Sequence, residues 1–251
     1  MEPIQTKFDR LASDPETSPF MKMKQYKSIQ EGFHALFSAE KDVEEPFIVS
    51  NCQEFSQVTV SSLATLFMEE RDVMCWYGTN EKTFNDASVH GATLYKAWLS
   101  DDLKYNVVDA PNQHLHLLAP ILRKNAENMP QDGQDYAICY ALTKANNLTP
   151  YHTDKYAQGW VYLTCGTKEW HIFSAKDVEY LENHGYSLEN IKNMDFNELV
   201  HILDNYLWGK IYVGKMRGGD FIYFPHLWAH RVVTFEKSFG VCGYNSTVNM
   251  K

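Results

Sequence analysis

The chain has 251 residues, a formal net charge of −9 and a hydrophobic fraction of 44%. This is the composition of an ordinary globular protein, and it excludes a disordered or fibrous chain. The excess of acidic residues disfavours electrostatic binding to nucleic-acid phosphates, which requires clustered Lys and Arg. We therefore do not expect nucleic acid as a partner; a small molecule or a basic polypeptide fits the charge better.

The five cysteines are scattered and odd in number, and no two of them are spaced as C-x-x-C. This pattern indicates reduced thiols in an intracellular protein, cytoplasmic or nuclear, without a disulfide framework or a cysteine zinc site. The N-terminus has no apolar stretch after its charged residues, and nowhere do 18 apolar residues follow one another. We therefore expect neither a signal peptide nor a membrane span.

The first part of the chain, up to residue 134, mixes helical and extended patterns. Residues 1–25 are polar and carry Pro and Ser, so we expect a flexible arm there. Residues 26–134 are expected to form an α+β support region. Helices are predicted at residues 26–37, 60–70, 92–99 and 119–127, and strands at residues 46–50 and 72–77.

From residue 135 onward, the sequence changes to short aromatic and β-branched runs separated by turns. Such a succession of short strands predicts a sandwich or barrel, and we expect residues 26–251 to form one domain with its β core at 135–251. Residues 175–204 have helical spacing and are expected to be an insertion between strands. Strands are predicted at residues 136–142, 160–164, 169–173, 210–215, 221–224, 231–235 and 239–245.

One candidate metal-binding pair is His152 and Asp154, in the segment LTPYHTD at residues 148–154. On an extended strand, side chains two residues apart leave the same face, so an imidazole and a carboxylate could meet one cation. A third ligand from a distant strand would complete a two-His, one-carboxylate face. That face leaves positions open for a substrate and dioxygen and favours Fe(II). His-x-Asp alone is common by chance, so the assignment of a metal site depends on finding a third ligand.

The second segment, GGDFIYFPHLWAH at residues 218–230, supplies that ligand. Gly-Asp before an aromatic strand, then Pro-x-x-Trp-x-His and two valines, predicts a strand, a tight turn and a returning strand that carries His230. This pattern resembles the JmjC and related cupin-like hydroxylases, which depend on Fe(II) and 2-oxoglutarate. The resemblance implies that His152, Asp154 and His230 are the metal ligands and the catalytic centre.

The resemblance extends to the cosubstrate site. Thr149 is similar to the hydroxyl donor of the family, and Lys168, in a Gly-x-Lys element, is similar to the lysine that pairs with the distal carboxylate of 2-oxoglutarate. By the same likeness, Asn245 would lie near the metal-chelating end. The chain departs from the family at Gln158, where an asparagine is often found. Tyr140 is our candidate for the aromatic contact to the cosubstrate.

The family likeness implies a mainly β fold: a double-stranded β-helix, or cupin-like jelly roll, preceded by the α+β region and interrupted by the helical insertion. It implies a dioxygenase that uses Fe(II), 2-oxoglutarate and O2, and forms succinate while hydroxylating its substrate. We expect that substrate to be a side chain of a protein or peptide, with a basic one favoured by the charge. Three alternatives stay open: a JmjC histone methyl-lysine demethylase, a small-molecule hydroxylase, and a non-catalytic binding module.

Other histidines could bind metal, but the sequence argues against it. His226 precedes His230 by four residues, a zinc spacing on a helix, yet Pro225 and the flanking aromatic residues oppose a helix there. We expect His226 to be a rim residue. His114 and His116 lack a nearby carboxylate and are expected to be structural. Three tryptophans are expected to belong to the core rather than to a substrate platform: Trp160, Trp170 and Trp228.

Overall fold

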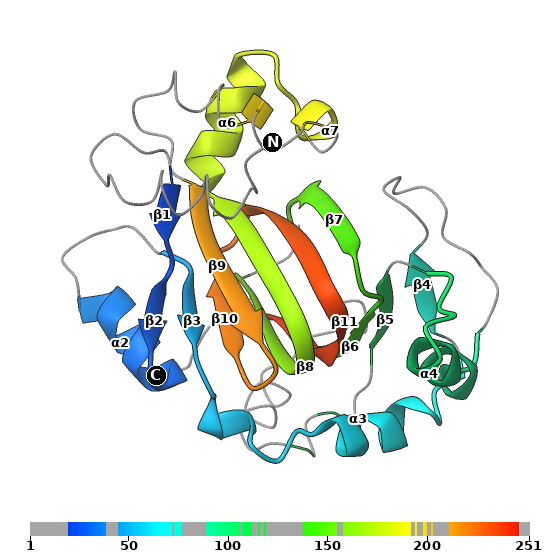
Figure 1. The fold of residues 1–251 in the computed structure, drawn as a ribbon. Helices are drawn as coiled ribbons and strands as arrows, with labels where there is room; N and C mark the ends of the chain where they lie inside the picture. The colour runs from blue at the N-terminus through cyan, green and yellow to red at the C-terminus, as the bar shows by residue number, and fades with distance from the viewer. Residues whose placement is uncertain are drawn as a thin grey trace, which may run out of the picture.

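The centre of the computed structural model is an 11-stranded sheet whose two halves face each other around a shared interior (Figure 1). Buried side chains from both halves meet in a single apolar cluster, which shows that the sheet folds back on itself. This is the predicted jelly roll, mainly β in composition. The structure describes residues 20–38, 45–71, 73–76, 89–105, 107–111, 115, 118, 138–154, 158–191, 194, 198–199, 202 and 211–245.

Two long strands, β8 (Gln158–Phe173) and β11 (Ala229–Asn245), pair antiparallel with each other and belong to both halves of the sheet. In the first half, β11 pairs with β7 (Asn147–His152) and β8 pairs with β9 (Ile211–Arg217). In the second half, the flanking strands are β6 (Ile138–Thr143) on β11, β10 (Phe221–Phe224) on β8, and β3 (Phe47–Val49) on β10.

The bend in β8 occurs near Gly166, which has a φ of +91°. Before the bend, Val161 and Leu163 point into the shared interior; after it, Trp170 and Ile172 do so. The inward positions therefore change from odd to even residue numbers. The prediction of separate strands at 160–164 and 169–173, and at 231–235 and 239–245, was wrong. Each pair is one bent strand, whose interrupted alternation resembles two shorter ones.

The N-terminal region extends the edges of the sheet. β1 (Phe20–Lys22) pairs parallel with β9, and β2 (Lys24–Tyr26) pairs parallel with β3. Residues 20–25, which we expected within a flexible arm, are thus strand residues in large part, because they satisfy backbone groups that β9 and β3 would otherwise expose. Residues 1–19 lie outside the described residues. On the other side, β4 (Met74–Trp76) and β5 (Val107–Pro111) continue the sheet from β6.

Helices cover the outer face of the second half of the sheet. They are α2 (Ile29–Ser38), the short 3-10 helix η1 (Gln53–Phe55), α3 (Val60–Phe67) and α4 (Gly91–Leu99). Their aromatic side chains pack against outward residues of the barrel strands; Phe67, for example, contacts the rings of Tyr140 and Phe239. The predicted helices near residues 26–37, 60–70 and 92–99 are confirmed. The helix predicted at 119–127 lies outside the described residues.

The first half of the sheet is covered by α6 (Ala175–Asn183) and α7 (Leu188–Ile191), which lie within the predicted helical insertion. A capping box starts α6: the Ser174 hydroxyl accepts from the Asp177 backbone amide, and the Asp177 carboxylate accepts from the Ser174 amide. None of the helices in the described part of the chain is long and apolar enough to cross a membrane.

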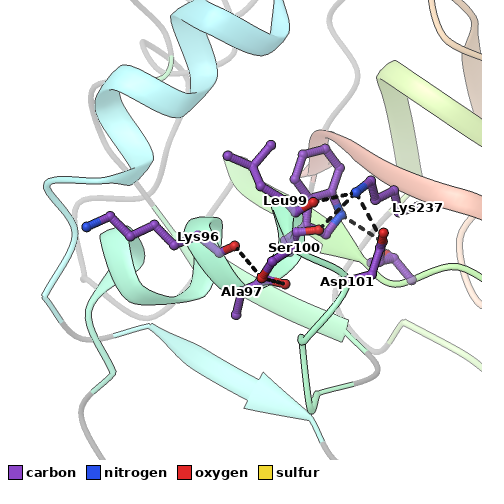
Figure 2. Close-up of polar contacts among 8 residues, drawn as sticks. Lys96, Ala97, Leu99, Ser100, Asp101 and Lys237 are labelled. Atoms are coloured by element: carbon purple, nitrogen blue, oxygen red, sulfur yellow. Dashed lines mark hydrogen bonds and ion pairs between the residues drawn. The ribbon is translucent and has the colours of Figure 1, made fainter.

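The C-terminal end of α4 is fixed to the barrel by Lys237 of β11 (Figure 2). Its ammonium donates to the carbonyl oxygens of Leu99 at 2.9 Å and Trp98 at 3.2 Å. The same group lies 3.0 Å from the Asp101 carboxylate. The Trp98 indole in turn donates to the Thr143 carbonyl of β6 at 3.1 Å. Through these contacts, α4 braces the region of β6 and β11 that adjoins the interior.

Candidate metal centre

Three side chains from β7, the residues just after it, and β11 meet at one end of the shared interior. His152 is the last residue of β7 and pairs directly with His230 of β11. Asp154 follows His152 by two residues. The ligand atoms of the three side chains all lie within 4.8 Å of one another. The predicted two-His, one-carboxylate group is therefore assembled from segments far apart in the sequence.

Both imidazoles are oriented by backbone carbonyl groups. The Nδ1 of His152 lies 2.8 Å from the Pro150 carbonyl oxygen, and the Nδ1 of His230 lies 3.3 Å from that of Trp228. A carbonyl only accepts, so each Nδ1 carries a proton, and Nε2 is the ring nitrogen that remains for a metal. The lone pairs of both rings are thereby available to a metal, as in metal sites where the second ring nitrogen donates to a fixed acceptor.

The distances and donor types fit a first-row divalent metal. The Nε2 of His230 and the Oδ2 of Asp154 are 3.6 Å apart. Two ligands that each lie about 2.1 Å from one ion can be at most about 4.2 Å apart, so this separation is compatible with shared coordination. Two imidazoles and a carboxylate on one face leave the opposite positions open, which is the arrangement of non-haem Fe(II) oxygenases.

Burial favours the uncharged state of His230 and of Asp154 when no cation is present. Desolvation lowers the pKa of His230 well below its ordinary value, and the neighbouring His152 adds to this, while the Trp228 carbonyl opposes it. Desolvation also raises the pKa of Asp154, against the opposing effect of His152. A bound dication would supply the positive charge that the buried carboxylate lacks, so the site is suited electrostatically to metal.

Aromatic residues enclose the inner side of the centre. The His230 ring lies 4.6 Å from the Phe224 ring and 5.7 Å from the Trp170 ring, measured between centroids. Trp170 therefore serves both the core and the wall of the site. Trp228 packs in the core against Tyr212, and Trp160 packs in the outer cluster, as expected. His226 is exposed in the turn before β11. His114 and His116 lie outside the described residues.

A strand irregularity gives Thr149 the same orientation as the metal ligands. On β7, Thr149 pairs with Val232, whereas His152 pairs with His230, so three residues of β7 face two of β11. This bulge at residues 150–151 keeps Thr149 and His152 on one face, although an odd spacing would otherwise separate them. Thr149 thus faces the interior, at the inward-facing position of β7 next to that of His152.

Lys168 also lies inside the barrel. It is 7% exposed and shares its strand face with Trp170, whose ring contacts His230. The Lys168 ammonium donates to the Thr143 hydroxyl at 3.0 Å. An ordinary surface lysine would keep its charge in water, so this interior position is the less common arrangement for a lysine.

Of the two other predicted cosubstrate residues, Tyr140 lies away from the candidate metal ligands, and the side chain of Asn245 is not among those described. Tyr140 is completely buried, but it packs with Phe67 and Phe239 in the cluster under the helices, on the face of β6 opposite the interior. The prediction for Tyr140 does not match this geometry, because inward positions of β6 are those of Cys139 and Ala141. Asn245 is the last residue of β11, and its side chain, like that of Gln158, lies outside the description.

Comparison with known proteins identifies the family. The family model for the cupin-like domain matches residues 99–250, more than half of the chain. The chain belongs to the cupin-like domain family. The match begins at the end of α4 and includes both long strands of the barrel, His152, Asp154 and His230. A search among curated proteins finds no match for the chain.

Three polar residues of the interior wall were missed by the sequence reasoning: Thr143, Asn147 and Thr234. All three are buried, with exposed fractions of 0%, 5% and 1%. The signal was weak, since a short polar residue in a strand is ordinary. Only Asn147, directly before the segment 148–154 and two residues before Thr149, could have been singled out by its alternation with Thr149.

Proposed function

We propose that this cupin-like protein is an Fe(II)- and 2-oxoglutarate-dependent dioxygenase of the JmjC type. The observation that carries the proposal is the meeting of His152, Asp154 and His230 at one end of an interior that also encloses the ammonium of Lys168. A metal with open positions and a buried cation on the same wall together suit a ligand that chelates at one end and has a carboxylate at the other.

The strand register sets a distance between His230 and Lys168 that one ligand can span. Lys168 pairs with Thr234, four residues along β11 from His230. Four strand residues span about 13 Å between Cα atoms. The lysine side chain and a five-carbon dicarboxylate can bridge this interval. In this proposal, Thr149 adds a hydroxyl donor between the two ends, and Asn245 acts near the metal-chelating end, as the family likeness implies.

When bound, Fe(II) and 2-oxoglutarate together supply the chemistry: one atom of O2 enters a substrate C–H bond, and the cosubstrate becomes succinate and carbon dioxide. The role of the protein is to hold the metal and the cosubstrate and to orient them. His152 and His230 present their Nε2 lone pairs because their Nδ1 protons are engaged. The rings of Phe224 and Trp170 exclude water from the inner side of His230, which strengthens the electrostatic interactions there.

For the substrate, we propose a side chain of a protein or peptide. The net charge of −9 favours a basic partner over a phosphate backbone. A histone methyl-lysine demethylase follows from the same chemistry, since hydroxylation of an N-methyl group leads to loss of the methyl. Small-molecule hydroxylation is the third candidate. A non-catalytic binding module is disfavoured because all three metal-ligand positions are retained and converge.

Succinate release tests the proposal directly. We expect Asp154→Ala and His230→Ala each to abolish 2-oxoglutarate turnover without unfolding the chain, because each removes a ligand from a three-ligand site. His226→Ala is the matched control, since this exposed histidine lies four residues from His230 but outside the ligand group, and it should retain turnover. Full turnover in both ligand variants at wild-type iron occupancy would contradict the metal assignment.

A further inference from the structure

Two buried polar side chains beside Lys168 are left with unused hydrogen-bonding groups. The hydroxyl of Thr234 and the amide nitrogen of Asn147 find no hydrogen-bond partner among the described residues. Both residues are at least 95% buried, with exposed fractions of 1% and 5%. Buried polar groups are almost always paired in folded proteins, so two such groups in one place indicate that something else completes them.

The strand register brings both groups into one row with the lysine. Thr234 of β11 pairs with Asn147 of β7 on one side and with Lys168 of β8 on the other. Residues directly opposite each other on paired strands have Cβ atoms about 5 Å apart and share a face. That face is the interior one, because Thr234 follows Val232 and His230 at even spacing along β11.

Thr143 of β6, also on the interior wall, holds the lysine end of this row. Its hydroxyl accepts from the Lys168 ammonium at 3.0 Å, and its carbonyl accepts from the Trp98 indole at 3.1 Å. These contacts limit the directions in which the ammonium can point. Lys168, Thr234 and Asn147 then offer one positive charge and two neutral donors, the combination from which a carboxylate accepts well.

We infer that Asn147 and Thr234 are specificity-determining residues that, with Lys168, bind the carboxylate remote from the metal. The inference rests on the proposed function and deepens it: it assigns the selectivity for a dicarboxylate over a monocarboxylate 2-oxo acid to two residues beyond the lysine. Each side chain donates one hydrogen bond to a charged oxygen. Loss of either donor is expected to weaken binding of the dicarboxylate about tenfold.

Calorimetric titration of the full chain, loaded with Mn(II) to prevent turnover, tests the inference. Thr234→Val and Asn147→Leu remove the donors at similar volume, and Thr234→Ser retains the hydroxyl as a matched control. The ligands are 2-oxoglutarate and 2-oxopentanoate, which has the same chelating end but lacks the distal carboxylate. We expect about tenfold weaker 2-oxoglutarate binding in the Val and Leu variants, unchanged 2-oxopentanoate binding, and near wild-type behaviour of the Ser variant.

Thermal unfolding of the metal-free variants gives a second readout. Because the two donors have no partner among the described residues, the Thr234→Val and Asn147→Leu chains should melt at or above the wild-type temperature. A clear decrease would mean that the groups serve the fold, and it would overturn the inference.

The titration has two further outcomes. Unchanged 2-oxoglutarate affinity in the variants, or an equal loss for both ligands, overturns the inference while the proposed function stands; water alone would then satisfy the two donors. A wild-type protein that binds neither 2-oxo acid contradicts the proposed function itself, and the inference with it.

Discussion

In the proposed function, Lys168 is the residue that distinguishes a cosubstrate site from a site for metal alone. Its ammonium is inside the barrel and donates to Thr143, and a buried cation of this kind is stabilised by an anionic ligand. We expect Lys168→Met to weaken the apparent affinity for 2-oxoglutarate about tenfold or more, since hydrogen bonds to charged groups contribute roughly 1.5–3 kcal/mol. The affinity is measured from succinate release at varied cosubstrate concentration.

The matched control for Lys168 is Lys215→Met, because Lys215 is an exposed lysine on the neighbouring strand β9. It should leave the apparent affinity unchanged. An equal, negligible effect of both substitutions would assign the distal carboxylate to a different cation.

At the same residue scale, the sequence predicted that His152, Asp154 and His230 come together, but it did not predict the face on which Tyr140 lies. Spacing put His152 and Asp154 on one face, and the pattern before His230 identified the third member of the group. Tyr140 was misplaced because all six residues of β6 are buried, so no alternation marks which face is the interior one. The orientation of Thr149 depends on a bulge, and a bulge leaves no periodic signal in the sequence.

At the scale of elements, the bend of β8 depends on Gly166. A Cβ atom there would lie 2.6 Å from the Lys237 carbonyl oxygen, and the φ of +91° is unfavourable for other residues. Gly185 has a similar φ of +85°, but a Cβ added to it would meet nothing within 4 Å. We expect Gly185→Ala to cost about 1 kcal/mol and Gly166→Ala about 3 kcal/mol or more in urea unfolding. Equal costs would show that the bend tolerates a side chain.

The attachment of α4 offers a second element-scale prediction (Figure 2). Lys237→Met should lower the free energy of unfolding by roughly 1 kcal/mol, because the ammonium satisfies two carbonyls at the end of the helix. Asp101→Asn should change it little: the Asp101 side chain is 73% exposed, so its ion pair is screened, and Asn tolerates the φ of 61° at this position. Urea denaturation of both variants distinguishes the helix contacts from the ion pair.

At the scale of the whole molecule, the sequence predicted the barrel better than its surroundings. Short aromatic strands from residue 135 onward indicated a jelly roll, and the cupin-like match to residues 99–250 agrees with it. The edge strands β1, β2 and β5 were not predicted, since three to five residues are too few to give a period. Their strand identity comes from pairing with distant partners, which local sequence does not encode.

The substrate is the prediction that belongs to the molecule as a whole. The chain has 32 acidic and 23 basic residues, and a surface of this balance attracts basic polypeptides and repels phosphate backbones. We therefore expect the loaded enzyme to add one oxygen atom to a side chain of a protein or peptide. Mass spectrometry of candidate peptides, methylated histone tails and metabolites tests this, with Asp154→Ala as the inactive control. Loss of a methyl group would favour the demethylase alternative, and turnover with free metabolites alone would contradict the prediction of a protein substrate.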